Sequence, residues 1–287
     1  MIGNRTKWMA GLVGAGIAVF GTAIPAQAST VPVGTVNVST IASPFDSNNK
    51  TINTACPAGT HVVGGGGQIA GGTGHVIFTE MRPITGASDS YRVTAVEDQV
   101  GEAGTWSLLT YAYCASGTLP GYEIVSNTSP VGSGAFQNTV STCSAGKYAL
   151  GAGGLVNNGS NQVDLETLGE GGTFSNRSTG AALEDQDGFS GNWSVTAFTV
   201  CVQPSSIFDL TMVKVYSVND ATTTKTATAS CPSGMRATGG AGWSDTPGHV
   251  TSVTPNSSTP FSVKVVARNT STTTGSWGAI ATVFCAL

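Results

Sequence analysis

Residues 56–67 read CPAGTHVVGGGG, and the same pattern returns as CSAGKYALGAGG at 143–154 and as CPSGMRATGGAG at 231–242. The opening cysteines of these stretches stand 87 and 88 positions apart. Each copy also contains Gly-x-Trp eight residues before a second cysteine, with the tryptophan at Trp106, Trp193 and Trp277. Because cysteine, glycine and tryptophan keep these offsets three times, the sequence predicts three repeats.

The repeat also predicts how the six cysteines pair. The simplest arrangement joins the two cysteines of each copy, at separations of 58, 58 and 54 positions: Cys56–Cys114, Cys143–Cys201 and Cys231–Cys285. A zinc site does not fit, because the chain has no C-x₂-C pair and only 3 histidines. We therefore expect three structural disulfides, which persist in oxidising compartments.

Residues 1–28 have the pattern of a signal peptide. Arg5 and Lys7 precede an apolar stretch at 10–24, and Pro-Ala-Gln-Ala at 25–28 is typical of a cleavage site. The alternative is a membrane-anchoring helix, but the apolar stretch is shorter than the ~20 residues that a span needs. We expect a mature protein that begins near Ser29, is secreted and extracellular, and keeps no membrane span.

The composition limits the fold classes and the kinds of partner that fit this chain. Only 10% of the residues are charged, 39 are glycine, and the net charge is −4. A dispersed and weakly acidic charge does not match a nucleic-acid backbone. Gly, Thr, Ser, Asn and Val are abundant, which disfavours long helices and favours strands.

Each repeat is predicted to be β throughout. The segments from each tryptophan to its closing cysteine, at 106–114, 193–201 and 277–285, are rich in Val, Thr, Tyr and Phe. Further candidate strands are 91–97, 225–231 and 261–268, and a valine eighteen residues before each opening cysteine (Val38, Val125 and Val213) marks another. Tryptophan and cysteine eight apart share one face of a strand. We expect that face to be core, the alternative being an exposed sugar-stacking platform.

Two all-β architectures fit this pattern. In one, the repeats at 29–115, 116–202 and 203–287 form three sheets around a pseudo-threefold axis, as a β-prism. In the other, they are three small β-sandwiches in tandem, each pinned by its disulfide. The short segments between the copies favour the closed arrangement, since independent domains usually have longer linkers.

The combination of Cys-Pro-x-Gly, a Gly-Gly-Gly cluster and Gly-x-Trp before a strand ending in Cys resembles a repeat of secreted actinobacterial proteins, most of them uncharacterised. The resemblance covers residues 50–287, although Ser144 replaces the proline in the second copy. It implies secretion and a β module, with no activity attached. The threefold Cys-x-x-Gly pattern also faintly resembles the vitelline membrane outer layer protein, a β-prism with a much shorter repeat, which implies a fold alone.

Three polar residues occupy matching places in the repeats. His75 and His249 stand in Gly-His-Val in the first and third copies, and Gln162 takes that place in the second. They are the candidate ligand-binding residues, one per repeat, the alternative being exposed residues at the start of a strand. His61 stands apart and is expected on the surface.

No catalytic, metal or cofactor site is predicted. The runs Glu-Asp-Gln at 97–99 and 184–186 place adjacent carboxylates on opposite faces of a strand, so neither run is a glycosidase pair. We interpret them as solvated turn ends. Asp185-x-Asp187-Gly188 is a fragment of a calcium loop without its other ligands. The glycine clusters lack the Lys of a phosphate loop and indicate close backbone approach or a β-bulge.

These patterns favour a secreted, non-enzymatic β-repeat protein that binds an extracellular surface, a glycan or polysaccharide in particular. Repeated weak sites would gain avidity. Two alternatives remain open. One is a structural component of an extracellular or spore-surface layer, and the other is a secreted inhibitor or toxin accessory directed at a protein.

Overall fold

The computed structural model describes residues 36–169, 172–173, 175–203, 210–256, 261–269 and 275–287. The predicted signal peptide, 1–28, lies outside the described residues. In the described part of the chain, all regular secondary structure is β, in nineteen strands. No helix there is long and apolar enough to cross a membrane.

The strands follow the chain in three groups. The first third contains β1 (Val36–Ala42), β2 (Lys50–Ala55), β3 (Thr60–Gly71), β4 (Val76–Ile84), β5 (Ser90–Glu97) and β6 (Trp106–Ser116). The second contains β7 (Glu123–Thr128), β8 (Phe136–Thr142), β9 (Tyr148–Asn157), β10 (Val163–Gly169), β11 (Gly172–Thr173), β12 (Arg177–Glu184) and β13 (Ser194–Val202). The third contains β14 (Thr211–Tyr216), β15 (Thr224–Ser230), β16 (Arg236–Ser244), β17 (Gly248–Pro255), β18 (Ser262–Asn269) and β19 (Ala279–Ala286). Every strand candidate named from the sequence falls on one of these strands.

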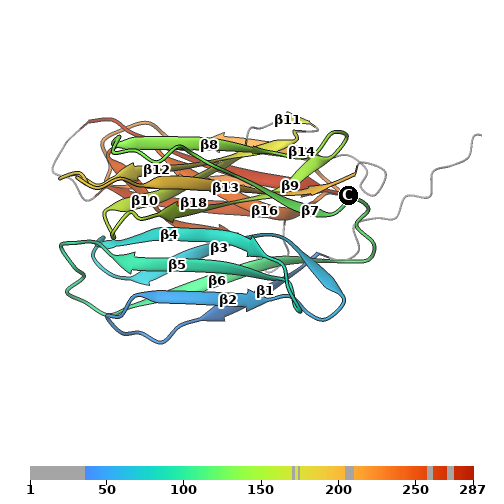
Figure 1. The fold of residues 1–287 in the computed structure, drawn as a ribbon, viewed down its shortest axis with the longest axis horizontal. Coiled ribbons are helices and arrows are strands. Elements are labelled where there is room, and N and C mark those ends of the chain that lie inside the picture. Colours follow the sequence, from blue (N-terminus) through green and yellow to red (C-terminus); the bar gives the residue numbers. More distant parts are fainter. Residues whose placement is uncertain (1–35, 170–171, 174, 204–209, 257–260, 270–274) are drawn as a thin grey trace, which may run out of the picture.

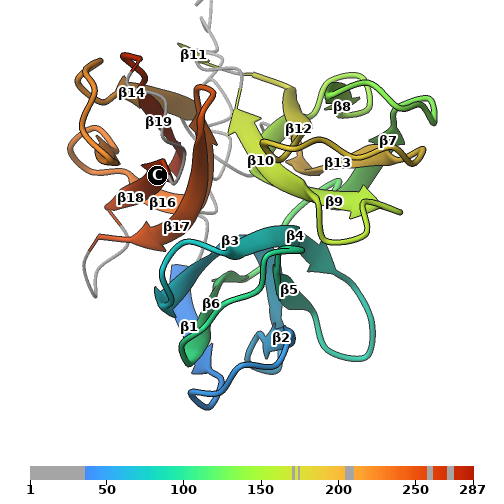
Figure 2. The same cartoon turned by 90° about the vertical axis from the view of Figure 1, so that its left-hand side faces the viewer.

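Hydrogen bonding divides these strands into four antiparallel sheets in a propeller-like arrangement. Two sheets have six strands, in the orders β1-β6-β3-β17-β18-β15 and β2-β5-β4-β9-β13-β7. The others are β11-β14-β19-β16 and β10-β12-β8. The strands run along the long axis of the molecule (Figure 1), and β3, β4, β9, β10, β16 and β17 lie nearest its middle (Figure 2).

Both predicted architectures are corrected by this pairing. The arrangement of separate sandwiches is wrong because two of the sheets each contain strands from two thirds of the chain. Glu80 of β4 pairs with Leu155 of β9, and Ser252 of β17 pairs with Gln68 of β3. A three-sheet prism is wrong because there are four sheets. The physical reason lies between β10 and β16. There the Glu166 carboxylate accepts the Ser244 backbone N–H at 2.9 Å, and the two strands pack without being paired in one sheet.

The glycine clusters bring three strands into backbone contact at the middle of the molecule. A Cβ on Gly151 of β9 would lie 2.1 Å from the Val63 carbonyl oxygen, and one on Gly64 of β3 would lie 2.5 Å from the Cα of Gly239 in β16. The register of β3, β9 and β16 against their neighbours shifts beside these glycines. The predicted close approach and bulges are therefore both confirmed.

The three tryptophans belong to the core, as predicted. Trp106 and Trp193 are 0% exposed and Trp277 is 1% exposed, so the alternative of a sugar-stacking platform is wrong. The residues between tryptophan and cysteine on the same face are also buried: Leu108, Thr110, Ala112, Val195, Ala197, Thr199, Ala279, Ala281 and Val283.

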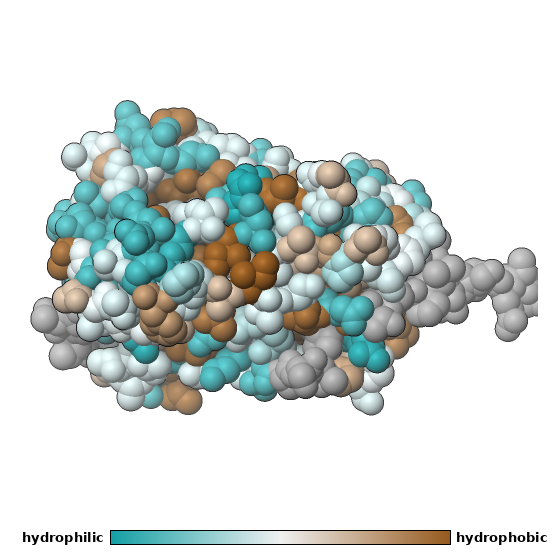
Figure 3. Space-filling model, turned by 90° about the horizontal axis from the view of Figure 1, so that it is seen from below, coloured by the Kyte–Doolittle hydropathy of each residue, from teal (hydrophilic) through white to brown (hydrophobic). Residues whose placement is uncertain are grey.

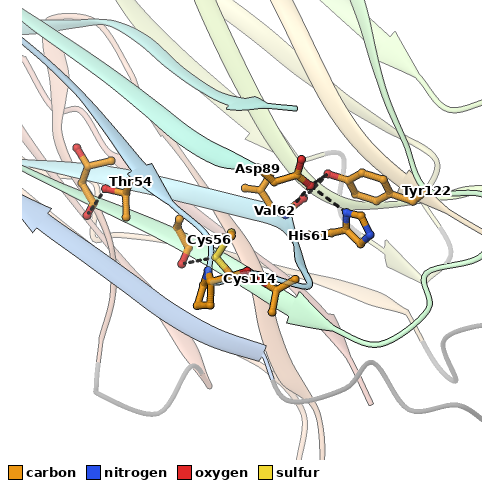
Figure 4. Close-up of a disulfide and its surroundings, with 11 residues drawn as sticks. Thr54, Cys56, His61, Val62, Asp89, Cys114 and Tyr122 are labelled. Atoms are coloured by element: carbon orange, nitrogen blue, oxygen red, sulfur yellow. Dashed lines mark hydrogen bonds and ion pairs between the residues drawn. A yellow bond between two sulfur atoms is a disulfide. The ribbon is translucent and has the colours of Figure 1, made fainter. Parts of the chain in front are cut away.

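The three disulfides join the predicted partners: Cys56–Cys114, Cys143–Cys201 and Cys231–Cys285. Figure 4 shows the first of them near His61, whose Nδ1 lies 3.0 Å from Asp89 Oδ2. His61 is exposed, as expected, and its ring packs against Tyr122 with the centroids 4.7 Å apart.

The molecule has two different ends, set by the antiparallel strand directions. We call one the disulfide end: it holds the disulfides, the start of β1 and the end of β19. The other, the pocket end, carries the turns after β1, β3, β5, β12 and β16. It lies at the left of Figure 1, opposite the C-terminus.

Candidate functional site: an acidic pocket between turns

A pocket of about 400 Å³ opens at the pocket end. Its wall is built from four turn segments, 74–77, 98–100, 183–187 and 246–249, together with Asp164 of β10. All three thirds of the chain contribute to it. Two of the residues singled out from the sequence, His75 and His249, lie in this one wall although 174 positions separate them.

His75 is held in place by Asp98. Its Nδ1 lies 2.8 Å from Asp98 Oδ2, and the Asp98 backbone N–H donates to the His75 carbonyl oxygen at 2.9 Å. The other oxygen of Asp98 accepts the backbone N–H groups of Val100 and Gly101. One carboxylate therefore fixes both the turn and the imidazole.

His249 lies at the start of β17, opposite Arg268 of β18. Its Nε2 is buried and has no hydrogen-bond partner. Burial lowers the pKa of His249 to about 4, and the positive charge of Arg268 acts in the same direction. At neutral pH the pocket therefore contains an uncharged imidazole with an unused polar atom.

Gln162 does not share the arrangement of the two histidines. It is absent from the pocket wall, and its carbonyl oxygen accepts the Asp185 backbone N–H at 3.0 Å. The structure thus brings together two of the three residues matched by the repeat. It places them in a single pocket, whereas the sequence suggested one site per repeat.

The glutamates of the two Glu-Asp-Gln runs bind tryptophan, so their interpretation as solvated turn ends is wrong. Trp106 Nε1 donates to Glu97 Oε1 at 2.9 Å, and Trp193 Nε1 donates to Glu184 Oε1 at 2.8 Å. A buried indole N–H requires an acceptor. The signal available in the sequence was a glutamate nine positions before the tryptophan in two copies.

Asp185 and Asp187 form a pair of facing carboxyl groups on the 185–188 turn. Burial and the adjacent carboxyl of Asp187 together raise the pKa of Asp185 to about 6, with burial as the larger cause. Neither oxygen of Asp185 has a partner in hydrogen-bond geometry, although the Gln99 side chain and the Gly188 backbone N–H lie near enough to lower its pKa. The carboxyl groups of Asp185 and Asp187 can bond to each other only when one of them is protonated. Gln99 Nε2 donates to Asp187 Oδ1 at the rim.

Asp164 is the wall residue that sequence reasoning missed. It is 7% exposed in β10, and its Oδ1 has no hydrogen-bond partner. Burial raises the pKa of Asp164 well above its usual range, with the charge of Asp185 as a smaller cause. The available signal was weak, because residues 163–168 read VDLETL and an acidic residue in such an alternating strand is ordinarily exposed.

Within the described residues, no group of three His, Cys, Asp or Glu side chains is placed to hold a metal ion. The calcium-loop fragment at Asp185 and Asp187 therefore acquires no further ligand from the described part of the chain.

The fold and the pocket define an all-β, disulfide-bonded protein with an acidic cavity between its turns. No protein-family model matches the chain, and no curated protein sequence matches it.

Proposed function

We propose that this chain is a secreted, non-enzymatic protein that binds a glycan of an extracellular surface in the acidic pocket. The observation that carries the proposal is the meeting of His75 and His249 in one wall with the carboxylates and amides of the 98–100 and 183–187 turns. Such groups donate to and accept from hydroxyls in the pattern that a sugar presents. A cavity of about 400 Å³ lies within the size range of small-ligand sites.

Secretion is supported by the three disulfides, which require an oxidising compartment. The meeting of His75 and His249 in one pocket changes the expected binding behaviour. Avidity between three repeat sites on one molecule is not required, and retention on a surface depends on one cavity and on how many chains the surface carries.

The test is retention of the protein comprising residues 29–287 on insoluble matrices: bacterial cell walls, chitin, cellulose and mycelium, at two salt concentrations. We expect selective retention on one polysaccharide, and the two salt concentrations measure how much of that retention depends on charge. Replacing His75 and His249 together by Ala should lower that retention about tenfold, which corresponds to ~1.4 kcal/mol.

The matched controls use the same chemistry outside the pocket. His61→Ala removes a histidine at the disulfide end, and Gln162→Ala removes the repeat-matched residue that is absent from the wall. Both should bind like the unchanged protein. Full retention by the double variant, with an unchanged melting temperature, would contradict the proposal.

Assembly into an extracellular layer is the second candidate, and one observation favours it. An exposed apolar side chain stands on the turn after the first strand of each third: Phe45, Val131 and Val218 are 62%, 66% and 73% exposed. The face in Figure 3 shows several apolar patches among hydrophilic side chains. Growth of light scattering with concentration, abolished when all three residues become Ser, is the expected result of assembly. A protein that stays monomeric rejects it.

A further inference from the structure

The charge of the pocket wall selects among glycans. The described residues of the wall include five carboxylates and neither Lys nor Arg: Asp98, Asp164, Glu184, Asp185 and Asp187. Two of them already have strong partners, since Asp98 holds His75 and Glu184 holds Trp193. Asp164, Asp185 and Asp187 remain without a cationic partner in the wall.

Buried acceptor atoms in the wall lack donors. Asp164 is more than nine-tenths buried, and its Oδ1 has no hydrogen-bond partner, although backbone N–H groups of Phe78 and Leu165 act on the same carboxyl. Neither oxygen of Asp185 has a partner in hydrogen-bond geometry, and its nearest donors are the Gln99 side chain and the Gly188 backbone N–H. A buried acceptor without a donor costs about 1–3 kcal/mol, and more when it is charged. Proteins normally satisfy such groups, so their concentration beside one cavity indicates that a ligand supplies the donors.

A protonated amine has the matching chemistry. An ammonium group has three N–H donors, no acceptor and one positive charge. Beside Asp185 and Asp187 it would replace the proton that the two carboxyl groups otherwise share, and it would relieve their repulsion. We propose, on the basis of the glycan-binding function above, that the ligand is an amino sugar with a free, protonated amine, a glucosamine oligosaccharide being the test case.

Other ligand charges fit the wall less well. A phosphate, a sulfate or a uronic acid would face five carboxylates without a lysine or arginine in the described wall. A neutral N-acetylated sugar can donate hydroxyl and amide hydrogens, but its binding gains nothing from the negative charge of the wall. A divalent metal ion finds no group of three suitable side chains in the described part of the chain.

Acid should weaken amine binding. As the pH falls through the pKa of Asp185, about 6, the carboxyl pair takes up a proton and loses the charge that attracts an amine. His249, with its pKa near 4, gains positive charge only below that range. Asp164 is the further carboxyl group that interacts with Asp185, and its raised pKa means that it also loses negative charge on acidification, in the same direction. Asp98, His75 and Arg268 act on His249.

The experiment compares two ligands of equal length by isothermal titration calorimetry near neutral pH. One is a glucosamine oligosaccharide with free amines, and the other is its fully N-acetylated counterpart. We expect the free amine to bind at least ~10-fold tighter, with a stronger dependence on salt. Asp187→Asn and Asp185→Asn should each remove most of that difference, because each lowers the affinity for the free amine far more than the affinity for the acetylated ligand.

Asp245→Asn is the matched control, because Asp245 is an exposed carboxylate beside the pocket turns but outside the wall. It should retain the preference for the amine. Asp187 is itself exposed, so its variant is expected to fold even if Asp185→Asn does not.

The outcomes separate the two proposals. Equal affinity for both oligosaccharides overturns selection of the amine and leaves glycan binding standing. Displacement of the amine by calcium, with the same dependence on Asp185 and Asp187, overturns it in favour of a metal site. Failure of both oligosaccharides to bind, together with no retention on any matrix, overturns both proposals.

Discussion

At the scale of single residues, the three buried tryptophans have different hydrogen-bond acceptors. Glu97 and Glu184 receive the indole N–H of Trp106 and Trp193, whereas Trp277 Nε1 donates to the Thr222 carbonyl oxygen at 2.8 Å. A backbone carbonyl replaces the carboxylate where the third copy has no glutamate. The indole N–H is therefore satisfied in all three places, by whichever acceptor the local sequence allows.

This arrangement predicts how Glu184 variants behave. Glu184→Ala leaves the buried Trp193 N–H without an acceptor and should destabilise the protein by about 1–3 kcal/mol. For a chain of this size that is a loss of roughly 2–4 °C in melting temperature per kcal/mol. Glu184→Gln keeps an oxygen in place and should lose much less. Equal melting temperatures for the Ala variant and the unchanged protein would show that the bond contributes nothing. Calorimetry provides the measurement.

At the scale of elements, the contact of β3, β9 and β16 depends on the absence of side chains. A Cβ at Gly151 would meet the Val63 carbonyl oxygen at 2.1 Å, and Val63 is the bulge residue of β3, held between Val62 and Gly64, which both pair with β6. The strand that contains Gly151, β9, cannot move aside alone, because it is paired with β4 on one side and with β13 on the other.

Gly151→Ala should therefore destabilise the protein by about 3 kcal/mol or prevent folding, as overpacking of a fixed interior does. Gly275→Ala is the matched control, since a Cβ at Gly275 meets nothing within 4 Å. Urea denaturation compares the two variants, and the control should have the midpoint of the unchanged protein. A Gly151 variant with that same midpoint would mean that the strands can separate at little cost.

At the scale of the whole molecule, the two six-stranded sheets join the thirds of the chain. The β4–β9 and β3–β17 pairings mean that no third can unfold without breaking a sheet shared with another. We expect one unfolding transition in calorimetry, with equal calorimetric and van't Hoff enthalpies. Separate transitions for the thirds would contradict this expectation and would favour independently folding units.

Local spacing predicted the strands, the disulfides and the tryptophan core, because each depends on offsets within one copy of the repeat. The number of sheets depends on which strand edges meet, and the Glu166–Ser244 bond that separates β10 from β16 joins residues 78 positions apart. The pocket was beyond prediction for the same reason. His75 and His249 were singled out by their matching positions, but their meeting depends on the β3–β17 pairing, and Asp164 looked like an ordinary strand residue.

The separation of the disulfide end from the pocket end has a practical consequence for orientation. The start of β1 and the end of β19 both lie at the disulfide end, away from the acidic cavity. A fusion partner, an affinity tag or a sensor surface attached at the C-terminus therefore leaves the cavity facing outward into the medium. Immobilised protein can be titrated without steric occlusion, and a chain tethered in this way would present its cavity to whatever approaches from solution.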